Sequence, residues 1–149
     1  MTTDFIIKVL IIIIISVICS LQDVMKQKVS NWKIILGYGL LLIYYLISCP
    51  KSIFYYLLNS LFIFLIFLIV KLIIKNRLGW ADVFFSAFLG LSLDYKYSIL
   101  AILLSVFIAI VYFLIYYFAK KERIERIPFI PSMSLGLLTG CIFMEITNL

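Results

Sequence analysis

Long apolar runs, each close to the length of a membrane-spanning helix, recur along the whole chain and constrain its fold more than any other feature. Of the 149 residues, 66% are hydrophobic and only 13% are charged. A soluble domain of this size needs far more polar surface, so the sequence predicts an integral membrane protein. No small-residue cleavage site follows the first run, and we expect that run to be retained as a helix.

Six segments approach the ~20 apolar residues that a transmembrane helix needs. Their expected ranges are 5–22, 34–49, 53–74, 79–94, 97–118 and 128–146. The fourth covers only about 24 Å at about 1.5 Å per residue, so residues 79–82 are expected near the bilayer interface. The sequence therefore predicts an all-α, polytopic membrane protein with six transmembrane helices in a single domain, residues 1–149.

The basic residues are distributed unevenly over the connections between these helices. Ten fall in the first, third and fifth connections: Lys26, Lys28, Lys33, Lys71, Lys75, Arg77, Lys120, Lys121, Arg123 and Arg126. Three fall on the opposite side: Lys8, Lys51 and Lys96. The positive-inside rule then places the first set in the cytoplasm and both termini outside. Because the charges are spread over several short loops, we expect no binding of nucleic acid.

Two of the seven acidic residues stand out on this topology. The other five fall in the outer face or in the mixed-charge loop KKERIER: Asp4, Asp94, Glu122, Glu125 and Glu145. Asp23 ends the first predicted helix and Asp82 begins the fourth, so both lie at the cytoplasmic end at similar depth. Asp82 has a structural reading as a helix N-cap or first-turn acid, which the helix dipole favours. Asp23 has a structural reading as an ordinary juxtamembrane residue, although a negative charge at a helix C-terminus is unfavourable because it opposes the helix dipole.

The pair also has a functional reading, because acids inside membrane helices are usually functional. Two carboxyl groups close together in a low-dielectric pocket share a proton and titrate as a coupled pair. One then acts as a general base on water, and the other donates a proton to a carbonyl oxygen. This chemistry hydrolyses a peptide bond without Ser, His or metal.

Other catalytic or metal-binding arrangements lack the residues that they need. The chain contains no His, and its three cysteines, Cys19, Cys49 and Cys141, are isolated. We therefore expect no structural zinc, no disulfide framework and no cofactor, with the cysteines acting as small apolar residues inside helices.

Three motifs, in order, resemble those of the type IV prepilin peptidases, intramembrane aspartyl proteases of the GxGD type. The first is similar to D-x5-I-P-N, with Asp23 followed by VMKQK and then Val29, Ser30 and Asn31. Val replaces Ile and Ser replaces Pro, while the Asn is kept.

The second and third motifs fall at the fourth and sixth helices. Gly79-Trp80-Ala81-Asp82 followed by Gly90 resembles the GxGD motif and its later Gly, with Ala81 in place of the second Gly. The segment from Pro128 through Pro131 to Gly136 resembles P-F-x-P-x4-G at full spacing.

By this resemblance, Asp23 and Asp82 are the catalytic pair, in a multi-pass protein of the cytoplasmic (inner) membrane whose active site faces the cytoplasm. Substrates of the family are prepilins and pseudopilins, in which a short basic leader and a Gly precede a long apolar helix. With a short first loop and no paired cysteines, the chain resembles the peptidase-only members, which lack N-methyltransferase activity.

The remaining motif residues have supporting or packing interpretations. Gly79 either lets the helix start unwind or is a simple loop residue, and Asn31 either caps a helix or orients Asp23. Pro128 and Pro131 are expected to begin the sixth helix. Gly136 with Gly140, and Ser86 with Gly90, form small-residue faces that favour close helix packing.

Two other functions compete with the peptidase. Ala81 favours a catalytically inactive relative that acts as a membrane scaffold for pilin-like helices. A small transporter or proton-coupled channel using Asp82 is disfavoured, because both acids fall at one face rather than at the midplane.

Overall fold

The computed structural model describes residues 3–26, 29–48, 50–74, 78–120 and 129–147, and within these ranges it is all-helical. Six helices follow one another along the chain: α1 (Thr3–Lys26), α2 (Asn31–Ser48), α3 (Ile53–Ile74), α4 (Trp80–Ser92), α5 (Tyr95–Lys120) and α6 (Ile130–Thr147). Each corresponds to one of the six segments expected from the sequence, so the all-helical prediction is confirmed. Pro128, Lys28, Lys75, Arg77 and residues 121–126 of the loop KKERIER lie outside the described residues.

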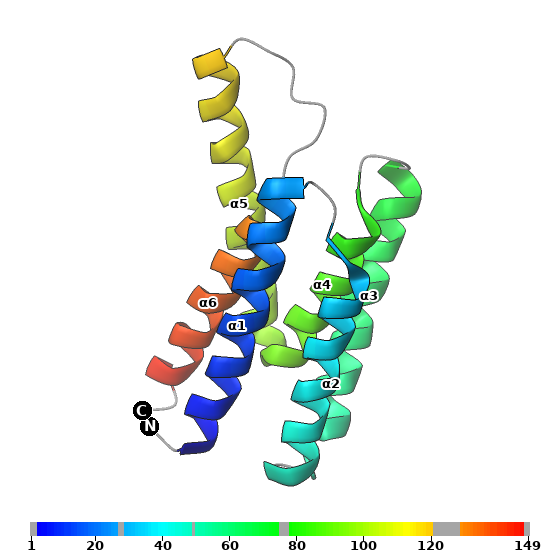
Figure 1. Ribbon diagram of the computed structural model, residues 1–149. Helices are drawn as coiled ribbons and strands as arrows, with labels where there is room; N and C mark the ends of the chain where they lie inside the picture. The colour runs from blue at the N-terminus through cyan, green and yellow to red at the C-terminus, as the bar shows by residue number, and fades with distance from the viewer. Residues whose placement is uncertain (1–2, 27–28, 49, 75–77, 121–128, 148–149) are drawn as a thin grey trace.

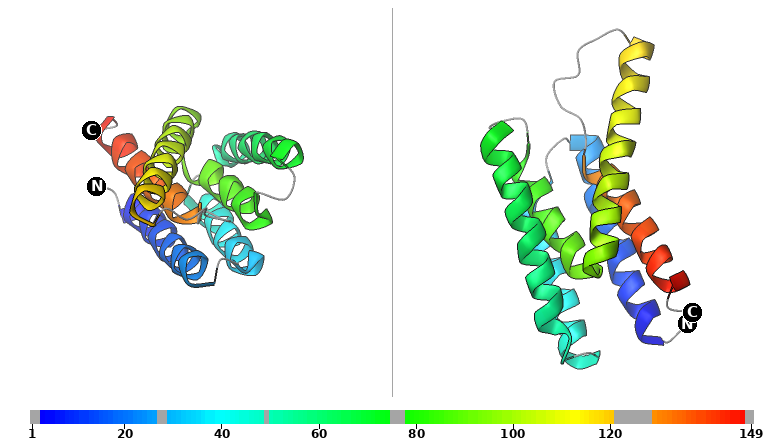
Figure 2. Two further views of the ribbon diagram at one scale, coloured as in Figure 1. Left: turned by 90° about the horizontal axis from the view of Figure 1, so that it is seen from above. Right: turned by 180° about the vertical axis from the view of Figure 1, so that it is seen from behind.

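Successive helices alternate in direction, so that the start of α1 and the end of α6 lie at the same end of the bundle (Figure 1). The helix α4 lies between two groups, packing against α2 and α3 on one side and against α6 on the other. The views from above and behind show α4 enclosed in this way, with α5 extending past the ends of the other helices (Figure 2).

The helix α4 is much shorter than its neighbours. The other five helices are long and apolar enough to cross a membrane. With 13 residues, α4 is only about 20 Å long, against about 30 Å for the hydrocarbon core of a bilayer. The fourth segment is thus even shorter than the 79–94 expected from sequence, and its C-terminal end lies inside the protein.

Side chains from α2 and α3 satisfy the backbone carbonyl groups at the buried end of α4. The Asn59 amide nitrogen donates to Gly90 O at 2.8 Å and to Leu93 O at 2.9 Å. The Tyr45 hydroxyl donates to Leu91 O at 3.0 Å. The last carbonyl groups of a helix lack intrahelical partners, and leaving them unbonded in an apolar interior costs free energy. These donors allow α4 to stop inside the bundle.

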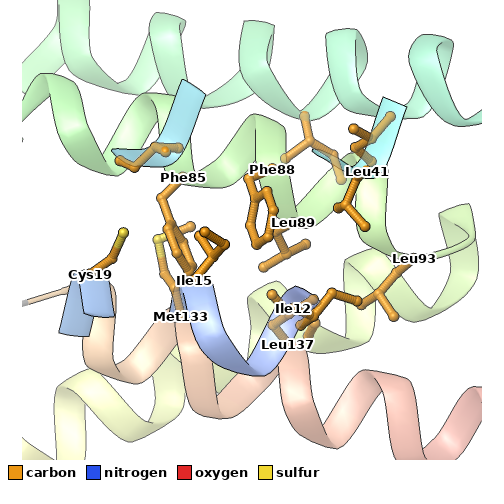
Figure 3. Close-up of a cluster of buried hydrophobic side chains, with 14 of the residues drawn as sticks. Ile12, Ile15, Cys19, Leu41, Phe85, Phe88, Leu89, Leu93, Met133 and Leu137 are labelled. Carbon is orange, nitrogen blue, oxygen red and sulfur yellow. The ribbon is translucent and has the colours of Figure 1, made fainter. Parts of the chain in front are cut away.

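The hydrophobic core forms around α4, which contributes three neighbouring large side chains (Figure 3). Residues from four helices meet there: Ile12 and Ile15 of α1, Leu41 of α2, Phe85, Phe88 and Leu89 of α4, and Met133 and Leu137 of α6. Leu93 and Cys19 extend the cluster toward its two ends. Because α4 is packed from both sides, its position along the bundle axis is fixed by contacts over most of its length.

One face of α1 is buried along the whole helix. Its buried residues recur every three or four positions, from Lys8 through Ile12, Ile15 and Cys19 to Asp23. At the first end, the Lys8 ammonium lies 5.4 Å from the ring centre of Tyr45 and 5.1 Å from that of Tyr56. This spacing defines a helix face directed at the core, and it turns Asp23 inward.

Two glycines of the motifs allow close contact between helix backbones. A Cβ atom on Gly90 would lie 2.8 Å from the Cα atom of Ser60 in α3. A Cβ atom on Gly136 would collide with Ser105 Oγ and with the carbonyl oxygen of Ala101 in α5. Both glycines are therefore needed for helix packing, as small residues commonly are in membrane proteins.

Gly90→Ala is expected to destabilise the fold by about 1–3 kcal/mol, because the added methyl meets backbone that has no side chain to move aside. The measurement is the midpoint of thermal unfolding in detergent micelles. Gly39→Ala is the matched control, since nothing lies within 4 Å of a Cβ atom there. Equal shifts in the two variants would contradict the packing role of Gly90.

Asn59→Asp keeps the shape of the side chain but removes the NH₂ group that bonds the end of α4. We expect a loss of about 1–3 kcal/mol for each carbonyl group left unbonded in the interior. Unfolding in detergent measures the total, and Asn59→Ala should be destabilised at least as much. A wild-type midpoint for Asn59→Asp would show that these bonds do not hold α4.

Candidate active site

Asp23 lies near the end of α1 and faces the first residue of α6. Its side chain is 9% exposed, and its Oδ2 atom accepts a hydrogen bond from the Ile130 backbone N–H at 3.2 Å. A nearby hydroxyl pair, Ser20 and Ser134 at 2.8 Å, also joins α1 to α6. A helix N-terminus carries partial positive charge. Asp23 therefore sits at the unfavourable end of its own helix but at the favourable end of α6.

Asp82 lies in the first turn of α4, and its Oδ2 atom accepts a hydrogen bond from the Gly79 backbone N–H at 2.9 Å. An acid at this position reaching back to the N-cap N–H forms half of a capping box. The first-turn reading from sequence is therefore realised. Like Asp23, Asp82 places a carboxylate at a helix N-terminus, where negative charge is favoured.

The fold brings the two acids together from distant parts of the chain. The Asp23 carboxyl lies close enough to Asp82 to interact with it electrostatically. Both are at the end of the bundle where α1 finishes and where α4 and α6 begin (Figure 1). The two carboxyl groups thus lie at the same end of the bundle, each at a helix N-terminus and each with one oxygen bonded by a backbone N–H.

Lys71, in the last turn of α3, brings a positive charge near Asp82. Its ammonium donates to Leu78 O at 2.6 Å, lies 4.7 Å from the Trp80 ring centre and interacts electrostatically with Asp82. The sequence interpretation used Lys71 only as a topological charge. Its position at the end of an apolar helix, shortly before the acid motif, was the signal that could have found it.

Gly79 does not need the conformational freedom of glycine. Its backbone is extended, with φ −73° and ψ 155°, which any residue can adopt. A Cβ atom there would lie 3.1 Å from Asp82 Oδ2. A larger residue at this position is therefore disfavoured by its closeness to the acid and not by the backbone conformation. Ala81 lies within the helical part of α4 and is half-buried, a setting that suits alanine well.

The other motif residues lie at varied distances from the acids. Asn31 is the first residue of α2, and among the described residues no hydrogen bond links its side chain to Asp23. Pro131 is the second residue of α6, where a missing N–H costs little. Gly90 and Gly136 contact α3 and α5, so they act in helix packing.

The structure presents no ready-made metal cluster in the residues that it describes, since no three His, Cys, Asp or Glu side chains gather there. Cys19 and Cys141 are both buried and free. Cys49 lies outside the described residues.

The helices and the acid pair define a class of protein: a multi-pass membrane protein with two interacting carboxyl groups at one end of its bundle. Residues 10–114 match the type IV leader peptidase family, and the chain belongs to this family. The family implies a peptidase, and the matched range includes both Asp23 and Asp82 but ends before α6. No curated protein and no solved structure matches the chain significantly.

A double-mutant cycle measures the interaction between the acids without relying on activity. Asn keeps an oxygen for the backbone hydrogen bond but cannot ionise or share a proton in the same way, so each single substitution, Asp23→Asn or Asp82→Asn, removes the interaction between the two carboxyl groups. We expect the change in unfolding free energy of the double variant to differ by at least about 0.5 kcal/mol from the sum of the changes in the two single variants. Strict additivity, measured in detergent at neutral pH, would place the two carboxyl groups out of contact.

Proposed function

We propose that the chain is an intramembrane aspartyl endopeptidase that removes the basic leader of prepilin-like proteins. The observation that carries this proposal is the placement of Asp23 of α1 and Asp82 of α4 at one end of the bundle, within range of electrostatic interaction. Membership of the type IV leader peptidase family supports the same activity. Gly79 would support the pair through its hydrogen bond to Asp82, and Gly90 and Gly136 would do so through helix packing. Asn31, Ala81, Pro128 and Pro131 would do so through their places in the three motifs.

In the proposed mechanism, the two acids share one proton and hold a water molecule between them. The ionised acid takes a proton from the water as its oxygen attacks the carbonyl carbon of the scissile bond, while the protonated acid donates to the carbonyl oxygen. The acid that took the proton from water then gives it to the leaving amine as the C–N bond breaks. At the same time the other acid takes a proton from a hydroxyl group of the intermediate, which restores the pair to its starting state.

The backbone hydrogen bonds described above leave one oxygen atom of each carboxyl group available for this chemistry. Each acid uses Oδ2 for a backbone N–H, and within the described part of the chain Oδ1 makes no hydrogen bond. We assign the free oxygen of each acid to the water and the substrate. The helix N-termini of α4 and α6 offset part of the cost of keeping negative charge in an apolar region.

The proposed topology has six membrane helices in one domain, both termini outside and the acids facing the cytoplasm. Two observations support it: the helices alternate in direction (Figure 1), and Lys26, Lys33 and Lys71 belong to the end of the bundle that holds the acids. Because α4 is short, it would cross the membrane together with the buried turn that follows it.

A catalytically inactive relative that binds pilin-like helices is the competing function, and Ala81 was its motivation. The helical setting of Ala81 provides no reason for lost activity. Binding of a leader-bearing protein by the wild-type chain, with no cleavage at any enzyme concentration, would favour this alternative.

Asp23→Asn and Asp82→Asn are each expected to lower the rate of leader removal by about 10²-fold or more, as loss of a general acid or base does. The assay co-expresses the chain with a short protein in which a basic leader precedes an apolar helix, and follows the mass of the product. Asp94→Asn is the matched control, an acid at the far end of α4, and should cleave at the wild-type rate. Wild-type processing by either active-site variant would exclude the acid pair as the catalyst.

A further inference from the structure

Lys71 of α3 makes two contacts with the segment that begins α4. Its ammonium donates a hydrogen bond to Leu78 O at 2.6 Å and lies 4.7 Å from the Trp80 ring centre. Leu78 and Trp80 flank Gly79, the N-cap residue of α4. A single side chain of α3 therefore holds the start of α4 on both sides of its N-cap.

The peptide group between Leu78 and Gly79 links Lys71 to Asp82. Its carbonyl oxygen accepts the bond from the Lys71 ammonium, and its N–H donates to Asp82 Oδ2 at 2.9 Å. Because a peptide group is planar, holding its oxygen also restrains the direction of its N–H. A cation at the oxygen polarises the group as well, and this strengthens the N–H as a donor. Lys71 thus acts on the Asp82 carboxyl through one peptide group.

Asp23 is held by a similar peptide group whose oxygen has neutral partners. The Ile130 N–H donates to Asp23 Oδ2 at 3.2 Å. The carbonyl oxygen of that peptide group belongs to Phe129, and it accepts from the Ser132 hydroxyl at 2.7 Å and from the Met133 N–H at 3.0 Å. Within the described residues, the acid of α4 is therefore the one whose backbone contact is supported by a full positive charge.

Two charged groups interact with the Asp82 carboxyl, the Asp23 carboxyl of α1 and the Lys71 ammonium of α3. The other charged side chains that the structure describes on helices packed against α4 lie at the surface or at the far end of the bundle: Lys33 of α2, Lys96 of α5 and Glu145 of α6. A pair of acids that shares one proton carries one negative charge. Lys71 is placed to offset that charge, and an opposite charge nearby favours the ionised form of an acid.

We propose that Lys71 is a positioning residue for the peptidase reaction. Through the Leu78–Gly79 peptide group it holds the direction of the Asp82 carboxyl, and its charge stabilises the single negative charge that the acid pair needs for catalysis. This inference rests on the peptidase function proposed above and adds a third side chain to its site. Because Lys71 acts through the backbone and does not touch the substrate, its removal affects kcat and not KM.

The test measures leader cleavage by the full chain in detergent micelles. The substrate is a synthetic peptide with a Lys-rich leader, a Gly and a Leu–Ala helix. Lys71→Met removes the charge and the hydrogen-bond donor but keeps an unbranched side chain. We expect kcat to fall by about tenfold or more with KM nearly unchanged, since a small misplacement of a catalytic group is costly.

The dependence of kcat/KM on pH tests the electrostatic part of the proposal. Activity needs one ionised carboxyl group in the pair, and the Lys71 ammonium favours that ionised form. Without the ammonium the negative charge forms only at higher pH, so the acidic limb of the profile should move up by about one pH unit in Lys71→Met. A purely structural role for Lys71 would lower activity without moving this limb.

Three further variants separate charge from structure. Lys71→Arg keeps a cation with donors for the same carbonyl group, and it should restore most of kcat and the wild-type acidic limb. Lys33→Met is the matched control, because it removes an exposed lysine at the same end of the bundle and should behave as the wild type. Trp80→Leu removes only the ring beside the ammonium, so it should lower kcat and leave the acidic limb in place.

The outcomes separate this inference from the function on which it rests. Wild-type kcat and pH dependence in Lys71→Met, or an equal shift in Lys33→Met, overturn the inference. If Lys71→Met shows no cooperative unfolding in detergent, Trp80→Leu decides instead, and a wild-type kcat there overturns it. Failure of the wild-type chain to cleave the peptide rejects the peptidase function. Cleavage that is lost in Asp82→Asn but unchanged in Lys71→Met leaves the function standing without Lys71.

Discussion

Backbone groups buried away from water must be hydrogen-bonded. The rest of the structure depends on how this requirement is met at the buried end of the short helix α4. Its C-terminal carbonyl groups end inside the protein and are bonded by Asn59 of α3 and Tyr45 of α2. Gly90 brings α4 against the backbone of α3. Because these contacts fix one end of a rigid helix, they also fix Asp82 at its other end.

The acids are held by a second constraint, the high cost of charge in an apolar environment. Here each acid faces the N-terminus of a helix, and Lys71 adds a positive charge beside Asp82. Placing Asp23 against α6 requires α1 and α6 to pack together, which the Ser20–Ser134 pair and the buried face of α1 accomplish. Local electrostatics and global packing therefore support the same arrangement.

The helices were predictable from sequence because apolar length is a local property, and every expected segment is found. The position of the acids at one end followed from counting helices, and their pairing followed from this shared depth together with the motif resemblance. The contacts that orient them did not follow, since the Ile130 N–H and the Lys71 ammonium reach the acids only through tertiary packing. Of the two readings left open for Gly79, the ordinary extended geometry fits that of a simple loop residue.

Asn59 marks a signal that sequence reading passed over. An amide within an apolar run must find partners after folding, and here its partners are the carbonyl groups of the following helix. The requirement was visible in the residue, but the identity of the partners depended on how α3 and α4 pack.

Because α4 ends inside the protein, the translocon that threads the nascent chain into the bilayer cannot treat it as an independent segment. Its 13 residues are too few to partition into lipid alone. Its terminal carbonyl groups can be bonded by Asn59 only if α3 lies beside α4 at that stage. Insertion of α3 and α4 together, as a hairpin, meets this requirement, because Asn59 is then present when the end of α4 enters the bilayer.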